Sequence, residues 1–167
     1  MIYLLCNLEI MKTKDSWASS DPYEYVMGRW SRLAARSFVD WLSPPPGLKW
    51  LDVGCGSGAL SDAITSDHEP AELTAIDQCE SFVITAQKRL GSLARCKVGN
   101  ALALPMKDSS VNITVSGLVL NFIPAPEKAL AEMRRVTAPG RTVALHVWDY
   151  AGKMDFLSYF WDIQTDV

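Results

Sequence analysis

The stretch LDVGCGSGAL, residues 51–60, combines an apolar run, one acidic residue and three glycines in ten positions. Glycine lacks a β-carbon and reaches left-handed backbone conformations readily, so another group can approach the main chain of such a loop closely. The run before the loop is typical of a strand, and the residues after it have helical spacing. The pattern predicts a ligand lying against bare amides at the start of a helix, with a purely structural tight turn as the alternative.

Asp77 ends a second apolar run, ELTAID, about 20 residues after the loop, where a carboxylate can accept both hydroxyls of a ribose. Gly54, Gly56 and Ala59 also satisfy the G-x-G-x-x-[GA] spacing of dinucleotide sites, so an NAD(P)-dependent oxidoreductase domain is one candidate. Asp52 argues against it, because a carboxylate beside the loop repels a pyrophosphate and attracts the ammonium group of a methionine moiety. The charges therefore favour S-adenosylmethionine as the ligand.

Apolar runs alternate with helical spacing through the middle of the chain. Strands are expected at residues 49–53, 73–77, 94–98, 111–116 and 142–148, and helical stretches lie around residue 60, at 82–90 and at 126–136, the last ended by TAPG. This alternation predicts an α/β fold, a Rossmann-like doubly wound parallel sheet with helices on both faces. Ligands of such sheets bind at the carboxyl ends of the strands, where the winding direction changes.

An amphipathic helix is expected before the first strand, from Asp21 as N-cap to Leu42, because the SPPPG that follows cannot continue a helix. Its apolar face would comprise Tyr23, Val26, Met27, Trp30, Leu33, Ala34, Phe38, Trp41 and Leu42.

In this context LDVGCGSG resembles motif I of the class I S-adenosylmethionine-dependent methyltransferases, and LTAID looks like the ribose-binding strand end of that family. Residues 99–145 are similar to its adenine loop, fourth strand, following helix and fifth strand. The residue sequence of these motifs is especially similar to that of the small-molecule branch of the family, which includes the ubiquinone and menaquinone biosynthesis methyltransferases. The resemblance covers about residues 23–150 and implies methyl transfer from S-adenosyl-L-methionine to a small-molecule acceptor.

The resemblance also implies which residues bind the cofactor. The loop glycines would line its methionine and ribose portions, an acid would lie near its amino group, and the ends of the next strands would hold the ribose and the adenine. One departure from the family pattern is Asn100, which stands where an acidic residue is common, so the adenine contact would lack a charge. The residues assigned to the cofactor are Asp52, Gly54, Cys55, Gly56, Gly58, Asp77, Gln78, Asn100, Ala101, Leu118 and, through the methionine carboxylate, Arg29.

No catalytic base is assigned from the sequence. His146, near the end of the fifth strand, could serve as one, although a core histidine is the favoured interpretation. No metal site is expected, because the four cysteines form no C-x-x-C pair and the chain has two histidines.

Composition limits the partners of the chain. A net charge of -3 over 167 residues gives no reason to expect nucleic acid or an anionic membrane surface. The apolar residues 1–10 are too short to span a bilayer and lack the basic start of an export signal. The scattered cysteines then indicate free thiols and a cytoplasmic location.

Three segments are expected: an extension at residues 1–20 outside the core, a cofactor-binding domain at 21–150, and a partial helix at 151–167. Family members usually continue past the fifth strand, so the resemblance implies a chain that is short at its C-terminus. A catalytically inactive binding module is therefore a further alternative. Self-association through the edge of the fifth strand or the aromatic tail at residues 156–161 is also expected.

Overall fold

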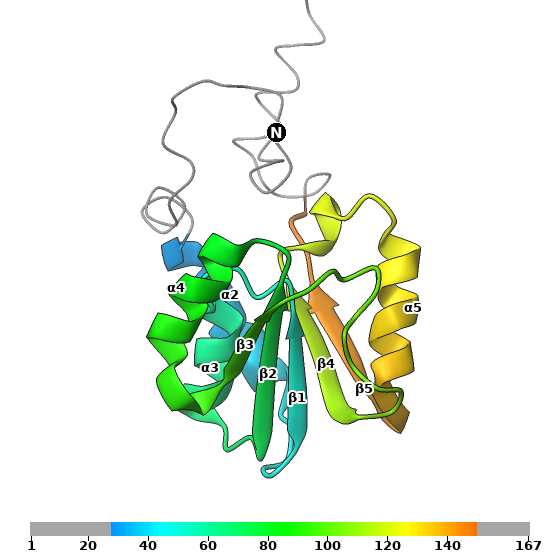
Figure 1. The fold of residues 1–167 in the computed structure, drawn as a ribbon. Helices are drawn as coiled ribbons and strands as arrows, with labels where there is room; N and C mark the ends of the chain where they lie inside the picture. Colours follow the sequence, from blue (N-terminus) through cyan, green and yellow to red (C-terminus); the bar gives the residue numbers. More distant parts are fainter. Residues whose placement is uncertain (1–27, 150–167) are drawn as a thin grey trace, which may run out of the picture.

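A computed structural model describes residues 28–149. Within them, five parallel strands form one sheet in the order β3-β2-β1-β4-β5 (Figure 1). The predicted doubly wound sheet is therefore confirmed. The strands are β1 (Lys49–Val53), β2 (Glu72–Asp77), β3 (Arg95–Val98), β4 (Val111–Gly117) and β5 (Thr137–His146).

Helices cover both faces of this sheet (Figure 1). The central strand β1 shows why, because its residues from Trp50 to Val53 are buried on both sides. Trp50 belongs to a core cluster with residues of three helices, whereas Leu51 and Val53 pack with Met133 of the fourth. Those three are α2 (Arg29–Leu42), α3 (Ala59–Asp67) and α4 (Glu80–Leu90), and the fourth is α5 (Pro126–Val136).

The helix boundaries follow local sequence signals. Pro126 occupies the first turn of α5, where its missing N–H costs nothing. Gly91 follows the last residue of α4 with a positive φ of 55°, a conformation that glycine adopts without a steric penalty. Two short 3-10 helices, at Gly91–Leu93 and Leu120–Phe122, complete the described helical segments.

The predicted apolar face of the first helix is partly wrong. Trp30, Leu33 and Trp41 are exposed, with 53%, 53% and 75% of their surface accessible. The buried side of α2 consists of Ser31, Ala35, Phe38 and Val39. Two of these buried residues, Ser31 and Ala35, are small and let that part of the helix lie close to its neighbours, and Phe38 and Val39 fill the core beside them. The predicted N-cap and first turns, residues 21–27, lie outside the described residues.

The segment TAPG ends the third predicted helix, as expected, but it also begins β5, which therefore starts at Thr137 and not at the predicted residue 142. The Thr137 hydroxyl donates to the carbonyl of Met133 and lies 2.6 Å from the Thr114 hydroxyl, which ties the first residue of the segment to both α5 and β4. Pro139 cannot continue a helix, so the chain enters the sheet directly. A register shift between Val111 and Ile113 absorbs the added residues.

The direction of winding reverses at β1, because β2 and β3 lie on one side of it and β4 and β5 on the other. Asp52 of β1 pairs in register with Ala75 of β2 and Val115 of β4. The loop that follows β1 therefore lies at the switch point of the sheet, where ligands of this architecture bind.

Candidate ligand-binding site

Residues 54–58, called here the glycine loop, cross the carboxyl end of β2. The N–H groups of Gly54 and Cys55 both donate to the carbonyl of Ile76, at 2.7 and 3.0 Å. The three glycines have positive φ values of 76°, 51° and 90°, which side chains other than glycine rarely adopt. Helix α3 starts immediately afterwards, so the loop leads from the central strand into a helix N-terminus as predicted.

The three glycines of the loop serve two different purposes. A β-carbon on Gly54 would lie 2.5 Å from Val119, and one on Gly58 would lie 3.3 Å from Ala86 of α4. A β-carbon on Gly56 would meet nothing within 4 Å. The first and third glycines therefore allow packing within the protein, and the open backbone for a ligand is at Gly56.

Asp77 holds the loop in place. Its Oδ2 accepts the N–H of Gly56 at 2.9 Å, and its Oδ1 accepts the N–H of Cys79 at 2.8 Å. Burial raises the pKa of Asp77, and hydrogen bonds from backbone N–H groups oppose this shift. A carboxylate has about four acceptor positions, and backbone N–H groups of Cys79, Gly56 and Gln78 act on this one, so acceptor capacity remains for a ligand hydroxyl. The sequence indicated a ribose contact but not this bond across 21 residues to the loop.

Asp52 lies beneath the loop and is fully buried. Its Oδ2 accepts the hydroxyl of Ser61 at 2.7 Å, whereas its Oδ1 has no hydrogen-bond partner among the described residues. Burial raises the pKa of Asp52 to about 7; the hydrogen bond from Ser61 opposes this shift and repulsion from Asp77 adds to it. With no accessible surface, Asp52 can act on a ligand through its charge or through a bridging water.

The residues after β4 pack against the glycine loop. Leu118 has a φ of 60°, and its N–H donates to the carbonyl of His146 at 2.8 Å. Val119 then lies against Gly54, as its short distance to a β-carbon there shows. A left-handed leucine is strained and persists because its surroundings fix it, so the carboxyl end of β4 is held in one conformation beside the loop.

Of the predicted adenine residues, Asn100 and Ala101 lie after β3 and Gln78 follows β2. The N–H of Gly99 donates to the carbonyl of Asp77 at 2.9 Å, which holds this segment beside the end of β2. Asn100 is exposed, and its side-chain oxygen accepts the N–H of Leu102 at 2.8 Å. Gln78 is exposed at the end of β2, and Ala101 packs against the core cluster below. The structure therefore gathers these three near Asp77.

The side chains of three other candidates contact groups of the protein itself. Cys55 is buried in the core cluster, and burial raises the pKa of its thiol. Arg29 is exposed, with its guanidinium 4.7 Å from the ring centroid of Trp30. His146 packs 4.6 Å from the ring of Phe38, and burial lowers its pKa, so the imidazole is neutral at pH 7. The core interpretation of His146 fits this position.

The expectation that the cysteines are free thiols holds for two of those described and fails for one. Cys55 and Cys96 are free thiols, as predicted. Cys79 is disulfide-bonded, so for this residue the expectation is wrong.

Sequence reasoning missed a network that we call the Arg135 clamp, formed by Leu104, Met106, Asp108, Glu132 and Arg135. Glu132 accepts the N–H of Leu104 at 2.8 Å and both Nε and Nη2 of Arg135 at 2.7 Å. Arg135 also donates to the carbonyls of Leu104 and Met106 and to Asp108. These bonds lower the pKa of Glu132 to about 2 and raise that of Arg135. The clamp fixes the segment after Asn100 to α5. The sequence pattern that could have indicated it is an acidic and a basic residue three positions apart, Glu132 and Arg135.

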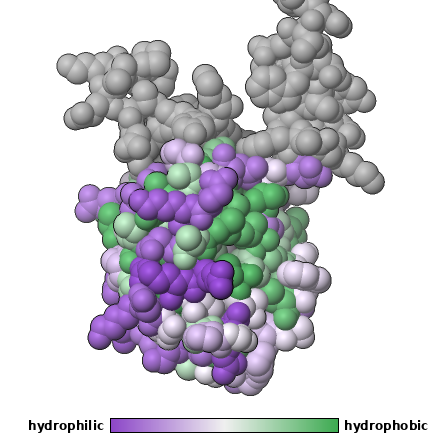
Figure 2. All heavy atoms as spheres, turned by 90° about the vertical axis from the view of Figure 1, so that its right-hand side faces the viewer, coloured by the Kyte–Doolittle hydropathy of each residue, from purple (hydrophilic) through white to green (hydrophobic). Residues whose placement is uncertain are grey.

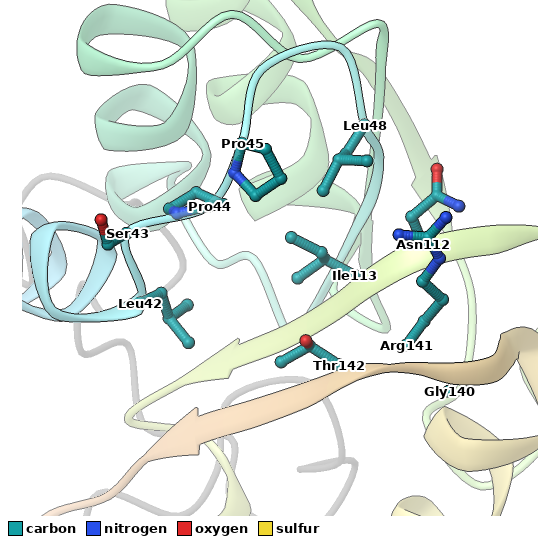
Figure 3. A pocket seen from close by; sticks show the side chains of 10 residues that line it. All are labelled: Leu42, Ser43, Pro44, Pro45, Leu48, Asn112, Ile113, Gly140, Arg141 and Thr142. Atoms are coloured by element: carbon teal, nitrogen blue, oxygen red, sulfur yellow. The ribbon is translucent and has the colours of Figure 1, made fainter.

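A cavity of about 150 Å³ lies away from this site (Figure 3). Leu42 to Pro45 line one side of it, and Ile113 and Thr142 line the other, near the amino ends of β4 and β5. Because small-molecule sites usually enclose about 300 Å³ or more, it is too small for a nucleoside ligand. Residues 28–149 contain no group of side chains that could hold a metal ion and no helix long and apolar enough to cross a membrane.

The chain is 31% identical over 114 residues to the ubiquinone/menaquinone biosynthesis C-methyltransferase UbiE of Roseobacter denitrificans, covering 65% of this chain and 46% of that protein. The chain thus spans about half the length of the curated relatives it matches.

Two solved structures share the fold. A chain from the complex between the Haloferax volcanii Trm112 methyltransferase activator and a methyltransferase has a TM-score of 0.75 at 21% identity, covering 86% of this chain and 65% of that one. The phosphoethanolamine N-methyltransferase 1 of Haemonchus contortus, solved with phosphoethanolamine and S-adenosylhomocysteine, has a TM-score of 0.65 at 16% identity, covering 80% of this chain and 32% of that one.

The family described as "Methyltransferase domain" matches residues 51–145, more than half of the chain, including the glycine loop, Asp77 and the segments after β3 and β4. The resemblance to class I S-adenosylmethionine-dependent methyltransferases is confirmed, and the chain belongs to the methyltransferase domain family.

Proposed function

We propose that this chain binds S-adenosyl-L-methionine at the glycine loop and, within the protein to which it belongs, serves methyl transfer to a small-molecule acceptor. One observation carries the proposal. A fully buried acid, Asp52, and a partly buried one, Asp77, flank a loop whose backbone is open at Gly56, and Asp52 has an oxygen without a partner among the described residues. A cationic ligand with a ribose suits this charge and these acceptors, whereas a pyrophosphate would be repelled.

The residues present fit such a cofactor group by group. Asp77 retains acceptor positions for the ribose hydroxyls while holding the loop. Gly56 supplies open backbone, and the segment from Leu118 lies on the methionine side of the loop in this proposal. Asn100 and Ala101 offer the adenine side a hydrogen-bonded turn without a charge. Arg29 is the weakest assignment, since its described contact is with Trp30.

When bound, the cofactor supplies a methyl group already activated by the adjacent sulfonium. The protein then has mainly to align donor and acceptor and to exclude water. In this chain, the glycine loop, Asp77 and the strained Leu118 provide a fixed surface for that alignment. No base is assigned, because His146 packs against Phe38.

The acceptor and the domain limits are parts of the same proposal. UbiE of Roseobacter denitrificans acts, by its name, in ubiquinone and menaquinone biosynthesis, and the Haemonchus contortus enzyme was solved with phosphoethanolamine. Both support a small-molecule acceptor without choosing one. We assign residues 21–150 to the cofactor-binding domain, with 1–20 and 151–167 outside its core.

Calorimetric titration with S-adenosylhomocysteine and, separately, with NADH tests the proposal. Binding of S-adenosylhomocysteine without binding of NADH is the expected result. Binding of NADH alone would instead indicate the oxidoreductase alternative. Binding of neither would favour a module that has lost its cofactor site.

We also propose that the chain self-associates through the edge of β5 and has little methyl transfer activity alone. Among the described strands β5 is the last of the sheet; Val143 on it is 37% exposed, and Val147 directly after it is 43% exposed. Figure 2 shows apolar surface on this side of the molecule, bordered by hydrophilic side chains. An unpaired apolar edge favours pairing with another chain.

Sedimentation at several concentrations measures this self-association. Substituting Val143→Lys and Val147→Lys should shift the parent's oligomers to monomer, and Ile84→Lys on the exposed face of α4 is the control. A parent chain that is monomeric at all concentrations and methylates an acceptor would contradict both parts of the proposal.

A cytoplasmic location is likewise a proposal. The free thiols of Cys55 and Cys96 support it, whereas the disulfide at Cys79 does not. Localising a tagged full chain in its native cells would decide between a reducing and an oxidising compartment.

A further inference from the structure

We propose that Asp52 carries a proton in the ligand-free protein and releases it to solvent when the cationic cofactor binds the glycine loop. The inference rests on the proposed function for its ligand but concerns a group of this chain. It makes Asp52 a residue that couples cofactor affinity to pH and that favours a positively charged ligand over a neutral one.

The position of the carboxyl group carries the argument. Asp52 is 0% exposed, and its Oδ1 has no hydrogen-bond partner among the described residues. A buried carboxylate oxygen without a partner costs much more free energy than an unpaired neutral hydroxyl. Hydrogen bonding from Ser61, whose hydroxyl donates to Oδ2, stabilises the anion only in part, because burial still raises the pKa of Asp52.

The surroundings supply no positive charge. Facing Asp52 are Asp77 from the end of β2, the thiol of Cys55 from the glycine loop and the thiol of Cys96 from β3. From β4 and α3 its neighbours are Val115, in register beside it, and Ser61, neither of which titrates. Among the described residues, the charge that acts on Asp52 is therefore that of another acid.

The same burial gives Asp52 a pKa of about 7, within the range where a nearby charge changes its protonation. A cation at the open backbone of Gly56 would stabilise the anion and lower this pKa. The proton then leaves to the buffer as the ligand binds, and the new ion pair acts across the loop. Affinity therefore falls when the pH is lowered, because the proton competes with the ligand.

Calorimetric titration of the full chain with S-adenosylmethionine in two buffers of different ionisation enthalpy counts the protons released on binding. We expect release that is largest near pH 6 and small at pH 8, and an affinity that falls about tenfold between pH 8 and pH 6. Adenosine, which carries no positive charge, should bind without releasing a proton.

Three variants separate Asp52 from other sources of protons. Asp52→Asn should abolish both the release and the pH dependence, and Ser61→Ala should move the midpoint to higher pH by removing the hydrogen bond that favours the anion. Asp67→Asn, at the end of the same helix as Ser61, is the matched control and should behave like the parent. Equal proton release by the parent and Asp52→Asn would overturn the inference.

Infrared spectroscopy tests whether Asp52 is protonated in the ligand-free chain. The parent at pH 6 should show the carbonyl band of a protonated carboxyl group that is missing in Asp52→Asn and lost as the pH rises to 8. If the chain binds no S-adenosylmethionine but shows this band, the proposed function fails and the protonation stands. If the band is absent, the inference fails whatever the chain binds.

Discussion

The glycine loop and the Arg135 clamp use the same device with opposite electrostatic outcomes. In each, a carboxylate accepts a backbone N–H from a distant part of the chain, Asp77 from Gly56 and Glu132 from Leu104. The clamp adds a cation, and the pKa of Glu132 falls to about 2. The loop adds a second acid, Asp52, and the pKa values of both of its acids are raised.

The difference separates a structural network from a candidate binding site. In the clamp, Arg135 compensates the charges of Glu132 and Asp108, so the network is complete within the protein. In the loop, burial is not offset by any cation among the described residues, which makes the ligand-free state electrostatically unfavourable. Sites whose charges are left uncompensated are where ligands of opposite charge bind.

The largest effect is expected on the ligand affinity of the glycine loop, after substitution of Asp77. Asp77→Ala should weaken S-adenosylhomocysteine binding roughly tenfold or more, because it removes charge-assisted ribose hydrogen bonds of about 1.5 to 3 kcal/mol each. It also removes the acceptor that holds Gly56. Calorimetry measures the affinity, with Asp67→Asn as control. Unchanged affinity would show that the ribose assignment is wrong.

Arg135→Met should act on stability without acting on affinity. The substitution removes the donors to Leu104, Met106 and Asp108 and leaves the charge of Glu132 uncompensated. We expect a melting temperature lower by several degrees and an affinity for S-adenosylhomocysteine close to that of the parent. A large loss of affinity would mean that the two regions are coupled. Arg134→Met, exposed on the same helix, is the matched control.

The two regions should respond to pH in opposite directions. Asp52 has its pKa raised from 3.8 to about 7, so the folded state binds the extra proton and stability is lost as pH rises through this range. Glu132 has its pKa lowered from 4.5 to about 2, so its contribution is present above 4.5 and is lost as pH falls towards 2.

Denaturant unfolding across pH measures both contributions as differences from the parent. Asp52→Asn should raise ligand-free stability above pH 7 and give no gain near pH 4. Glu132→Gln should lower stability at neutral pH and differ least from the parent near pH 2. The same pH profile for both variants would contradict the contrast between loop and clamp.

The smallest effect is expected at the open glycine. Gly56→Ala adds a methyl group that meets nothing within 4 Å, so its cost is the left-handed backbone alone, about 1 kcal/mol. Gly54→Ala should cost clearly more, since its methyl would overlap Val119. Thermal unfolding compares the two. Equal losses would show that the contact with Val119 is easily relieved.

The sequence by itself determined the alternation of strands and helices, the turn after β1 and the acid that ends β2. These features depend on local periodicity, on glycine and proline, and on residue types within a few positions, all of which can be read along the chain. The helix at 126–136 and the strand at 49–53 have the predicted bounds for this reason.

Tertiary structure decided what each of these residues does. Gly54 and Gly58 face Val119 and Ala86, which come from segments far along the chain, so their roles could not be distinguished from that of Gly56 in the sequence. The buried side of α2 and the Arg135 clamp could not be predicted from the sequence for the same reason. Burial and charge compensation depend on which remote segments meet, and the pKa of about 7 at Asp52 arises only once β1 is enclosed by its neighbours.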